Sequence, residues 1–384
     1  MENQNIKFNL TWEEYFCKLL EENLDLDWNW YYISFNPKIT LDFVKKYRHK
    51  DWDWVKLSTN KNIKMIDIEE NLDLPWDWYW VSQNPNINLD FVKKHKTKDW
   101  NWGELSMHEN IKPKDLEENL DLNWICVSYN PNITIEFVKK HKSKYWRWCQ
   151  LSRHDNIKTI DIEENINLKW DWDYISDNRN INLDFVKNHI DKEWNWGSLS
   201  MNENIKVKDI EDNLYFDWDW DCISVNPNIT LDFVEKYKHK PWDWSELSRH
   251  KNIKVKDIEE NLDLDWDWYC ISVNPNINLD FVKKHIDEKW DWLELSRHKN
   301  IKMKDIEENL DLDWVWYYIS INPNIDLDFV KKYRHKNWNW RWLSKNSFNG
   351  GKEKFEKEKK NYIIQYCFPS YIPIEIRRMI VNLN

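Results

Sequence analysis

Three aspartates at alternate positions are the part of this sequence that looks most like a metal site. Asp263, Asp265 and Asp267 match the first half of a calcium-binding loop, whose oxygen ligands also alternate along the chain. Such a loop needs a glycine directly after the third ligand for its sharp turn, and Trp268 stands there instead. The same acidic run recurs beside tryptophan elsewhere in the chain. We therefore predict no calcium site.

The histidines and cysteines also lack the spacing of metal ligands. The 11 histidines return at recurring places in a repeated pattern, and the 6 cysteines form no C-x-x-C pair. A zinc site needs several such ligands close together. We interpret the histidines as structural polar residues and the cysteines as reduced and mostly buried, and we expect no metal and no other cofactor.

Catalytic motifs are missing as well. The sequence contains no G-x-x-x-x-G-K phosphate loop, no G-x-G-x-x-G dinucleotide fingerprint, no G-x-S-x-G nucleophile elbow and no H-E-x-x-H zinc motif. We predict that the protein is not an enzyme and has no catalytic residues.

A tryptophan repeat dominates the sequence instead. The pattern Trp-x-Trp recurs about every 24 residues, a step within the range of known structural repeats. Its first members run from Trp28 to Trp338. An isoleucine keeps the same step from Ile39 to Ile325, and one shorter unit retains only Trp124. A fixed period of this length is typical of a solenoid, in which each repeat packs only on its neighbours.

Each unit is predicted to form two short helices of about 6–10 residues, at the short end of the range for globular helices. In residues 36–59, Thr40 is a good N-cap, and Leu41, Phe43 and Val44 supply an apolar face. A strand interpretation of the Trp alternation fails after two or three residues, and the chain has only 4 Gly for turns. We predict an all-α tandem-repeat solenoid of about 14 helix-turn-helix units, each of roughly 24 residues.

Charge alternates between successive units and gives a super-period of about 48 residues, twice the length of one repeat. Residues 36–59 carry six Lys or Arg against three Asp, whereas residues 60–83 carry two Lys against five acidic residues. Basic helices should therefore lie between acidic ones, with Lys45 and Lys46 beside Glu69 and Glu70. Because exposed ion pairs stabilise a fold only weakly, we interpret the alternation as control of register.

The tryptophans have two interpretations, as core residues or as exposed platforms that stack on bases or sugars. The strict period favours the core for most of them. Trp80 and Trp342 lie outside the regular pair and are candidate partner-binding residues. Successive units meet at a joint of the form S-x-[N/H], which begins at Ser82 after Trp80 and at Ser344 after Trp342. Both tryptophans occupy the position two residues before this joint serine. That position is aromatic or Cys in every second unit, so we expect it to be buried in alternate units only.

The segments "WVSQNPNINLDFVKKH", "PWDWSELSRHKNIKVKDIEEN" and "ISVNPNITLDFVEKY" resemble the N-P-N-I-T / P-W-D-W short-repeat proteins of giant DNA viruses of the mimivirus group. The resemblance covers about residues 3–346. It implies a giant-virus origin and a helical-repeat fold, and it implies no mechanism.

The C-terminal segment departs from the period. We predict a helical repeat solenoid over residues 1–346, with residues 1–35 as an N-terminal capping unit, and a cap helix with an F-box-like segment over residues 347–384. Pro373, Glu375, Ile376 and Ile380 are similar to the opening of a truncated F-box and are candidate partner-binding residues. An amphipathic cap helix that begins at Pro373 is the alternative.

Bulk properties narrow the function. The net charge of −11 makes a nucleic-acid partner unlikely on charge grounds, because such proteins collect uncompensated Lys and Arg. No apolar run is long enough to span a bilayer, and the polar start is no signal peptide, so we expect an intracellular protein, in the host cytoplasm if it is viral. We expect a non-enzymatic protein–protein interaction scaffold. One alternative is a substrate receptor for a cullin-type ubiquitin ligase, which would bind a ligase adaptor through the F-box-like C-terminus. The other is a virion structural protein.

Overall fold

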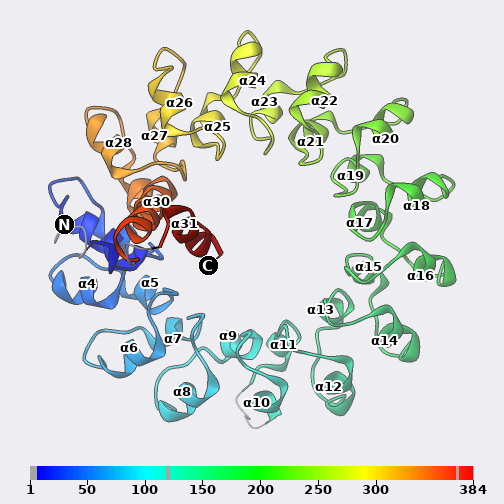
Figure 1. Ribbon diagram of the computed structural model, residues 1–384. Helices are drawn as coiled ribbons and strands as arrows, with labels where there is room; N and C mark the ends of the chain where they lie inside the picture. The colour runs from blue at the N-terminus through cyan, green and yellow to red at the C-terminus, as the bar shows by residue number, and fades with distance from the viewer. Residues whose placement is uncertain (1–6, 118–121, 369–371, 384) are drawn as a thin grey trace. The chain divides into compact units, whose positions relative to one another are not determined.

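The computed structural model describes residues 7–117, 122–368 and 372–383, and these residues form helices and no strand. The all-α tandem-repeat prediction is therefore confirmed (Figure 1). The chain divides into two compact units. Unit 1 holds residues 1–77 together with 292–384, and unit 2 holds residues 78–291.

Each repeat contributes one even-numbered and one odd-numbered helix. Every odd-numbered helix of the repeats begins at the second tryptophan of a pair or at its equivalent: α3 (Trp30–Ile33), α5 (Trp54–Ser58), α7 (Trp78–Val81), α9 (Trp102–Met107), α11 (Trp124–Val127), α13 (Trp148–Ser152), α15 (Trp172–Ile175), α17 (Trp196–Met201), α19 (Trp220–Ile223), α21 (Trp244–Arg249), α23 (Trp268–Ile271), α25 (Trp292–Arg297), α27 (Trp316–Ile319) and α29 (Trp340–Lys345).

The even-numbered helices carry the charged sequences: α4 (Leu41–Lys46), α6 (Met65–Glu69), α8 (Leu89–Lys94), α10 (Pro113–Glu117), α12 (Ile135–Lys140), α14 (Thr159–Glu164), α16 (Leu183–Asn188), α18 (Val207–Glu211), α20 (Leu231–Lys236), α22 (Val255–Glu260), α24 (Leu279–Lys284), α26 (Met303–Glu307) and α28 (Leu327–Lys332). A longer helix, α2 (Trp12–Glu21), takes this place in the first repeat, and α30 (Asn349–Tyr366) and α31 (Ile374–Leu383) follow the last. In unit 2 the odd-numbered helices follow the inner side of the curve and the even-numbered helices the outer side (Figure 1).

The helices of the repeats are shorter than the sequence predicted. After α2 they span 4 to 6 residues. Their first turns are capped as expected, since the Thr40 side chain accepts a hydrogen bond from the Phe43 N–H and the Asp53 side chain accepts one from the Lys56 N–H. Helices this short are not stable alone, so packing between repeats must hold them.

The first tryptophan of each pair is buried and has a polar partner for its indole. These tryptophans are 5–9% exposed. Each indole N–H donates to the backbone carbonyl five residues earlier, as from Trp28 to Asn23 at 2.9 Å and from Trp266 to Asn261 at 2.7 Å. The bond satisfies a carbonyl at or just beyond the end of the preceding helix, which would otherwise lack a partner.

The second tryptophan joins one repeat to the next. Trp30 lies nearly parallel to Phe43 of the following repeat, with ring centroids 6.0 Å apart, and meets Trp52 edge-on at 5.3 Å. In the alternate repeats only the edge-on contact recurs among the described rings, as between Trp54 and Trp76 at 5.2 Å. The prediction that most tryptophans are core residues is therefore confirmed for the first of each pair, while the second is half-buried.

A buried ladder of serine and asparagine runs through the joints between repeats. Ser34 donates to the Trp30 carbonyl and accepts the Asp53 N–H of the next repeat at 2.9 Å. Asn60 returns the link, because its side-chain amide donates to the carbonyls of Ser34 and Asn36 at 3.3 and 3.0 Å. The same bonds recur in unit 2, where they are made by Asn130, Asn178, Asn202, Asn226 and Asn274.

Histidine replaces asparagine at some joints without changing the pattern. His154 Nε2 lies 3.0 Å from the Asn130 carbonyl, and its Nδ1 accepts the Asn156 N–H at 3.1 Å. These correspond to two of the bonds of Asn202, whose side-chain amide also donates to the Ser176 carbonyl.

The first and last repeats meet within unit 1 through the same ladder. The Asn29 N–H donates to Ser344 Oγ at 3.0 Å, and Asn36 donates to the carbonyls of Ser344 and Asn346 at 3.1 and 2.9 Å. Trp28 meets Trp340 edge-on at 5.5 Å, as a first tryptophan meets the second tryptophan of the preceding repeat elsewhere. The N-terminal repeat therefore packs on the last repeat as on a predecessor.

Helix α30 strengthens this contact. Phe355 stacks on Tyr15 of the first repeat at 4.6 Å, and Lys354 pairs with Asp328 of the last repeat. Gly350 is required at the start of α30, because a Cβ there would lie 1.9 Å from the Asn324 carbonyl oxygen. Residues 347–366 thus bind both the first and the last repeat.

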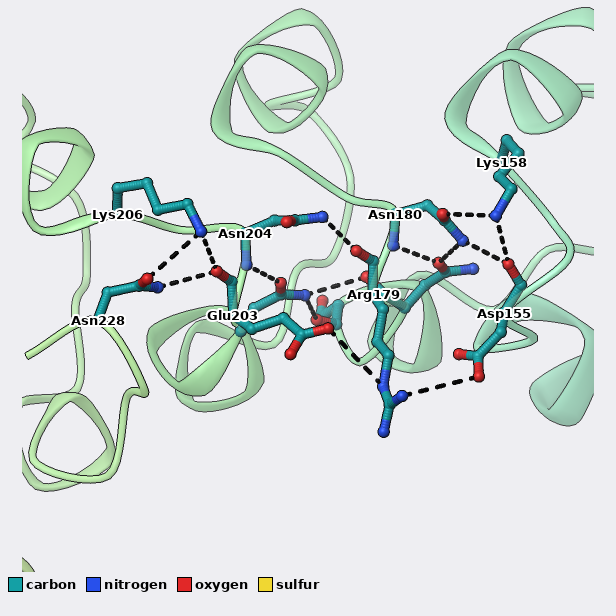
Figure 2. Close-up of polar contacts among 11 residues, drawn as sticks. Asp155, Lys158, Arg179, Asn180, Glu203, Asn204, Lys206 and Asn228 are labelled. Carbon is teal, nitrogen blue, oxygen red and sulfur yellow. Dashed lines mark hydrogen bonds and ion pairs between the residues drawn. The ribbon is translucent and has the colours of Figure 1, made fainter. Parts of the chain in front are cut away.

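A second line of polar bonds follows the loops beside the ladder. In unit 2, Lys158 donates to the Asp155 carbonyl and to Asn180 Oδ1 of the next repeat, and Lys206 does the same with Glu203 and Asn228 (Figure 2). Arg179, where other repeats have proline, lies between the carboxylates of Asp155 and Glu203 at 3.9 and 4.0 Å. These exposed contacts add little stability and continue the repeat pattern.

The charged helices pair in one direction. Lys46 meets Glu21 of the preceding repeat at 2.8 Å, so the predicted pairing with Glu69 and Glu70 of the following repeat is wrong. Four further pairs of 2.7–2.8 Å run the same way, and they join Lys140 to Glu117, Lys236 to Glu211, Lys284 to Glu259 and Lys332 to Glu307. Basic helices do lie beside acidic ones, as the alternation predicted.

Replacement of Asn202 by Ala tests the ladder. The variant leaves the carbonyls of Ser176 and Asn178 without their donor in a buried joint, so the free energy of unfolding should fall by about 1–3 kcal/mol. Asn202→His, which copies His154, should lose much less. Urea unfolding of both variants checks this, and equal losses would contradict the ladder.

Candidate interaction surfaces

Aligning the repeats with one another shows which positions keep the same residue and which vary. The joint isoleucine recurs throughout, and the exposed parts of the even-numbered helices repeat nearly unchanged charged sequences. Variation is pronounced on the odd-numbered helices and directly after them, at the positions one, two and five residues after the second tryptophan. We call these positions the variable face.

The first position of the variable face, directly after the second tryptophan, holds large exposed apolar side chains in several repeats. Five of these side chains are 43–59% exposed, namely Tyr31, Tyr79, Ile125, Tyr269 and Tyr317. Gly103, Asp173, Gly197 and Asp221 occupy the same position in other repeats, and the ladder continues through those repeats. The packing of the repeats therefore does not require an aromatic residue at this position, and exposed apolar groups of this kind mark interaction surfaces.

The predicted contact residues Trp80 and Trp342 both belong to the variable face but lie in different units. Trp80 in α7 meets Tyr79 edge-on at 5.8 Å. Trp342 in α29 lies 4.7 Å from Tyr317 and 5.4 Å from Tyr318. Both rings are half-buried, and so is their position in every described repeat, so the prediction of burial in alternate units is wrong.

Within unit 1, aromatic side chains of the first repeat and of the last two repeats form two groups, which the α29 residues Arg341 and Lys345 connect. We call both groups together the terminal aromatic patch, which comprises Tyr31, Tyr32 and Phe35 in one group and Tyr317, Tyr318 and Trp342 in the other. Lys345 Nζ lies 4.4 Å from the centre of Tyr32 and 4.3 Å from that of Phe35, and the Arg341 guanidinium lies 5.8 Å from Tyr32. Contacts of a cation with the face of a ring at these distances are attractive.

A shallow groove of about 470 Å³ adjoins the patch. Its walls include the Trp342 ring and the Lys345 side chain, and no acidic residue lines it. Its remaining lining residues are Arg297, Ile321, Pro323, Asn346, Ser347 and Asn349.

The residues that the sequence analysis compared with an F-box lie on α31 or directly before it. Pro373 precedes the helix, and Glu375, Ile376 and Ile380 are all exposed on it. Ile376 and Ile380 are 47% and 40% exposed, and Met379 beside them is 64% exposed. Arg377 donates to the Ile364 carbonyl at the end of α30, which attaches α31 to the helix that binds the repeats.

Four of the six thiols have a raised pKa. Burial raises the pKa of Cys17 to about 11 and also raises the pKa of Cys126, Cys222 and Cys270. All six cysteines are free, but only Cys17 is buried, so the prediction that most are buried is wrong. A raised pKa lowers the share of reactive thiolate at neutral pH.

Three histidines at the joints between repeats have a lowered pKa. Burial lowers the pKa of His108, His154 and His250, although the carbonyl that each ring faces acts in the other direction. Among the described residues, no group of three or more His, Cys, Asp or Glu side chains is arranged to hold a metal ion. None of the described helices is both long and apolar enough to cross a membrane.

Comparison of the chain with protein-family models, with curated proteins and with solved structures gives no match.

Sequence reasoning found Trp80 and Trp342 but missed the exposed tyrosines and the terminal aromatic patch. The exposed tyrosines could have been found from the sequence, because the variable positions follow from aligning the repeats with one another. The patch was not foreseeable in that way, because it joins the first repeat to the last.

Stability should fall as the pH drops below about 6.5, because the unfolded chain binds protons at its histidines near that pH while the buried joint histidines remain neutral. Protonation of His154 would also set an Nδ1–H against the Asn156 N–H. The contribution is fully present above pH 7 and is lost as the pH falls. Thermal unfolding of His154→Asn/His250→Asn should show a smaller loss over this range. An equal loss in the variant and in the natural protein would contradict the assignment.

Proposed function

We propose that this protein is a non-enzymatic scaffold that binds other proteins through the variable face of its odd-numbered helices. The observation that carries the proposal is the contrast within each repeat. The buried ladder and the charged even-numbered helices are repeated nearly unchanged, whereas the exposed position after the second tryptophan ranges from Gly and Asp to Tyr and Ile.

The even-numbered helices are a weaker candidate for the binding surface. Their lysines pair with glutamates of the preceding repeat, as Lys140 does with Glu117 and Lys284 with Glu259. Such pairing neutralises much of the field that a charged partner would need. Exposed tyrosines, in contrast, supply contact area at a low cost in side-chain entropy.

Site-specific photo-crosslinking tests the variable face. A benzophenone amino acid at Tyr79 or Tyr269 should crosslink a protein partner that mass spectrometry identifies, whereas the same probe at Lys139 or Lys187 on the even-numbered helices should not. Tyr79→Asp/Tyr269→Asp, which copies Asp173 and Asp221, should then weaken binding of that partner about tenfold or more. Equal crosslinking from both sets of positions would contradict the proposal.

A second candidate function is that of a substrate receptor for a cullin-type ubiquitin ligase. The exposed apolar face of α31, with Ile376, Met379 and Ile380, favours it, because an amphipathic helix with such a face can dock into a groove on a partner. On this proposal the adaptor binds α31 and the substrate binds the variable face.

Binding of a purified cullin-ligase adaptor tests this candidate. The natural chain should retain the adaptor on a column, and Ile376→Asp/Ile380→Asp should abolish retention because a carboxylate replaces each apolar contact. Arg378→Ala on the same exposed helix is the control and should bind normally. A natural chain that does not retain the adaptor rules the candidate out.

A further inference from the structure

The last repeat lacks an ion pair that two other repeats possess. In α21 and α25 a glutamate two residues after the helix-initial tryptophan pairs with an arginine three residues later, as Glu246 does with Arg249 and Glu294 with Arg297. In α29 the same two positions hold Trp342 and Lys345. The carboxylate is therefore replaced by an aromatic ring, and the cation remains.

The cations of α29 make no ion pair within the described part of the chain. Lys345 lies over the rings of Tyr32 and Phe35, and Arg341 lies over Tyr32. The protein has a net charge of −11, yet these two cations form no ion pair with the described residues and lie against aromatic rings, and Lys345 also lines a groove that has no acidic lining.

Packing of the repeats does not explain these residues. Ser198 and Cys222 occupy the position of Trp342 in other repeats, and Gly103 and Asp221 occupy that of Tyr317. Those repeats keep the same ladder, as the bonds of Asn226 to the Ser200 and Asn202 carbonyls show. The aromatic and cationic side chains are therefore not needed for the joint.

We propose that the terminal aromatic patch and its groove bind an acidic linear segment of a partner protein. A carboxylate of the partner takes the place of the missing glutamate and meets Lys345 and Arg341. An apolar or aromatic side chain next to that carboxylate packs on Trp342 and Tyr32. This inference rests on the proposed scaffold function and names the partner chemistry for one part of the variable face.

A protein segment fits this surface better than a nucleic acid. Two cations neutralise only two or so phosphates, whereas a bound single strand needs a long basic groove.

The test uses the full chain and an array of ten-residue peptides in which two Asp or Glu flank one Phe, Trp, Leu or Pro, beside versions with Lys or Gln in place of the acids. Acidic peptides with a central apolar residue should be retained, and the best of them, labelled with fluorescein, should bind by anisotropy with an affinity that falls as salt is raised. Retention of no acidic peptide, or equal retention of the Lys and Gln versions, would overturn the proposal.

Variants copied from other repeats assign the binding to the groove. Trp342→Glu restores the internal ion pair of α21 and α25 and should weaken peptide binding about tenfold or more, because Lys345 then has its own carboxylate. Trp342→Ser removes only the aromatic wall and should weaken it less. Lys345→Glu should abolish binding of acidic peptides and admit their Lys versions.

Arg153→Glu is the matched control, because Arg153 takes the register position of Lys345 in unit 2 and lies over Tyr174. It should leave peptide binding unchanged. Loss of peptide binding in this control as in Lys345→Glu would overturn the proposal, as would tighter binding of a labelled dT20 strand that Lys345→Glu abolishes. Failure of the array beside successful crosslinking from Tyr79 and Tyr269 would remove this inference and leave the scaffold function standing.

Discussion

The joint between repeats depends on a few buried hydrogen bonds between side chains and backbone. Ser34 and Asn36 are fully buried, and each must find partners in the neighbouring repeat because an unsatisfied buried polar group costs about 1–3 kcal/mol. Apolar burial alone would allow two repeats to slide against each other. The ladder fixes one register, since the asparagine amide reaches the two carbonyls of the preceding repeat only there.

The tryptophans make such short helices possible. Helices of 4 to 6 residues have few internal hydrogen bonds, and most of their end groups need outside partners. The first tryptophan supplies one of these partners through its indole N–H and fills the space between the helices with its ring. Because ladder and rings together hold the repeat, the three positions of the variable face are not needed for the buried bonds of the joint. Those positions can change without loss of the fold, which is what a binding surface requires.

The sequence predicted the helical repeat because its signals are local and occur many times. Thr40 at an N-cap, the apolar positions of Leu41 and Phe43, and the return of Trp at a constant step all indicate the same element. Helix length was overestimated, since the turns after Ile33 and Tyr47 end helices that the apolar pattern alone would continue. The direction of the ion pair of Lys46 could not be read from charge alternation, because an acidic helix lies on both sides of each basic one and only geometry decides between them.

The contact between the first and last repeats shows that the joint does not depend on chain connection. Asn36 donates to the carbonyls of Ser344 and Asn346 in the same way as Asn346 donates to those of Ser320 and Asn322. The partners of Asn36 lie at the other end of the sequence, whereas those of Asn346 lie in the preceding repeat. A surface built on the odd-numbered helices therefore continues from the last repeat to the first within unit 1. As a result, Lys345 near one end of the sequence contacts the ring of Tyr32 near the other end. Periodicity predicts each repeat and its neighbours, whereas a site of this kind arises only when the fold brings two copies of the same joint surface together.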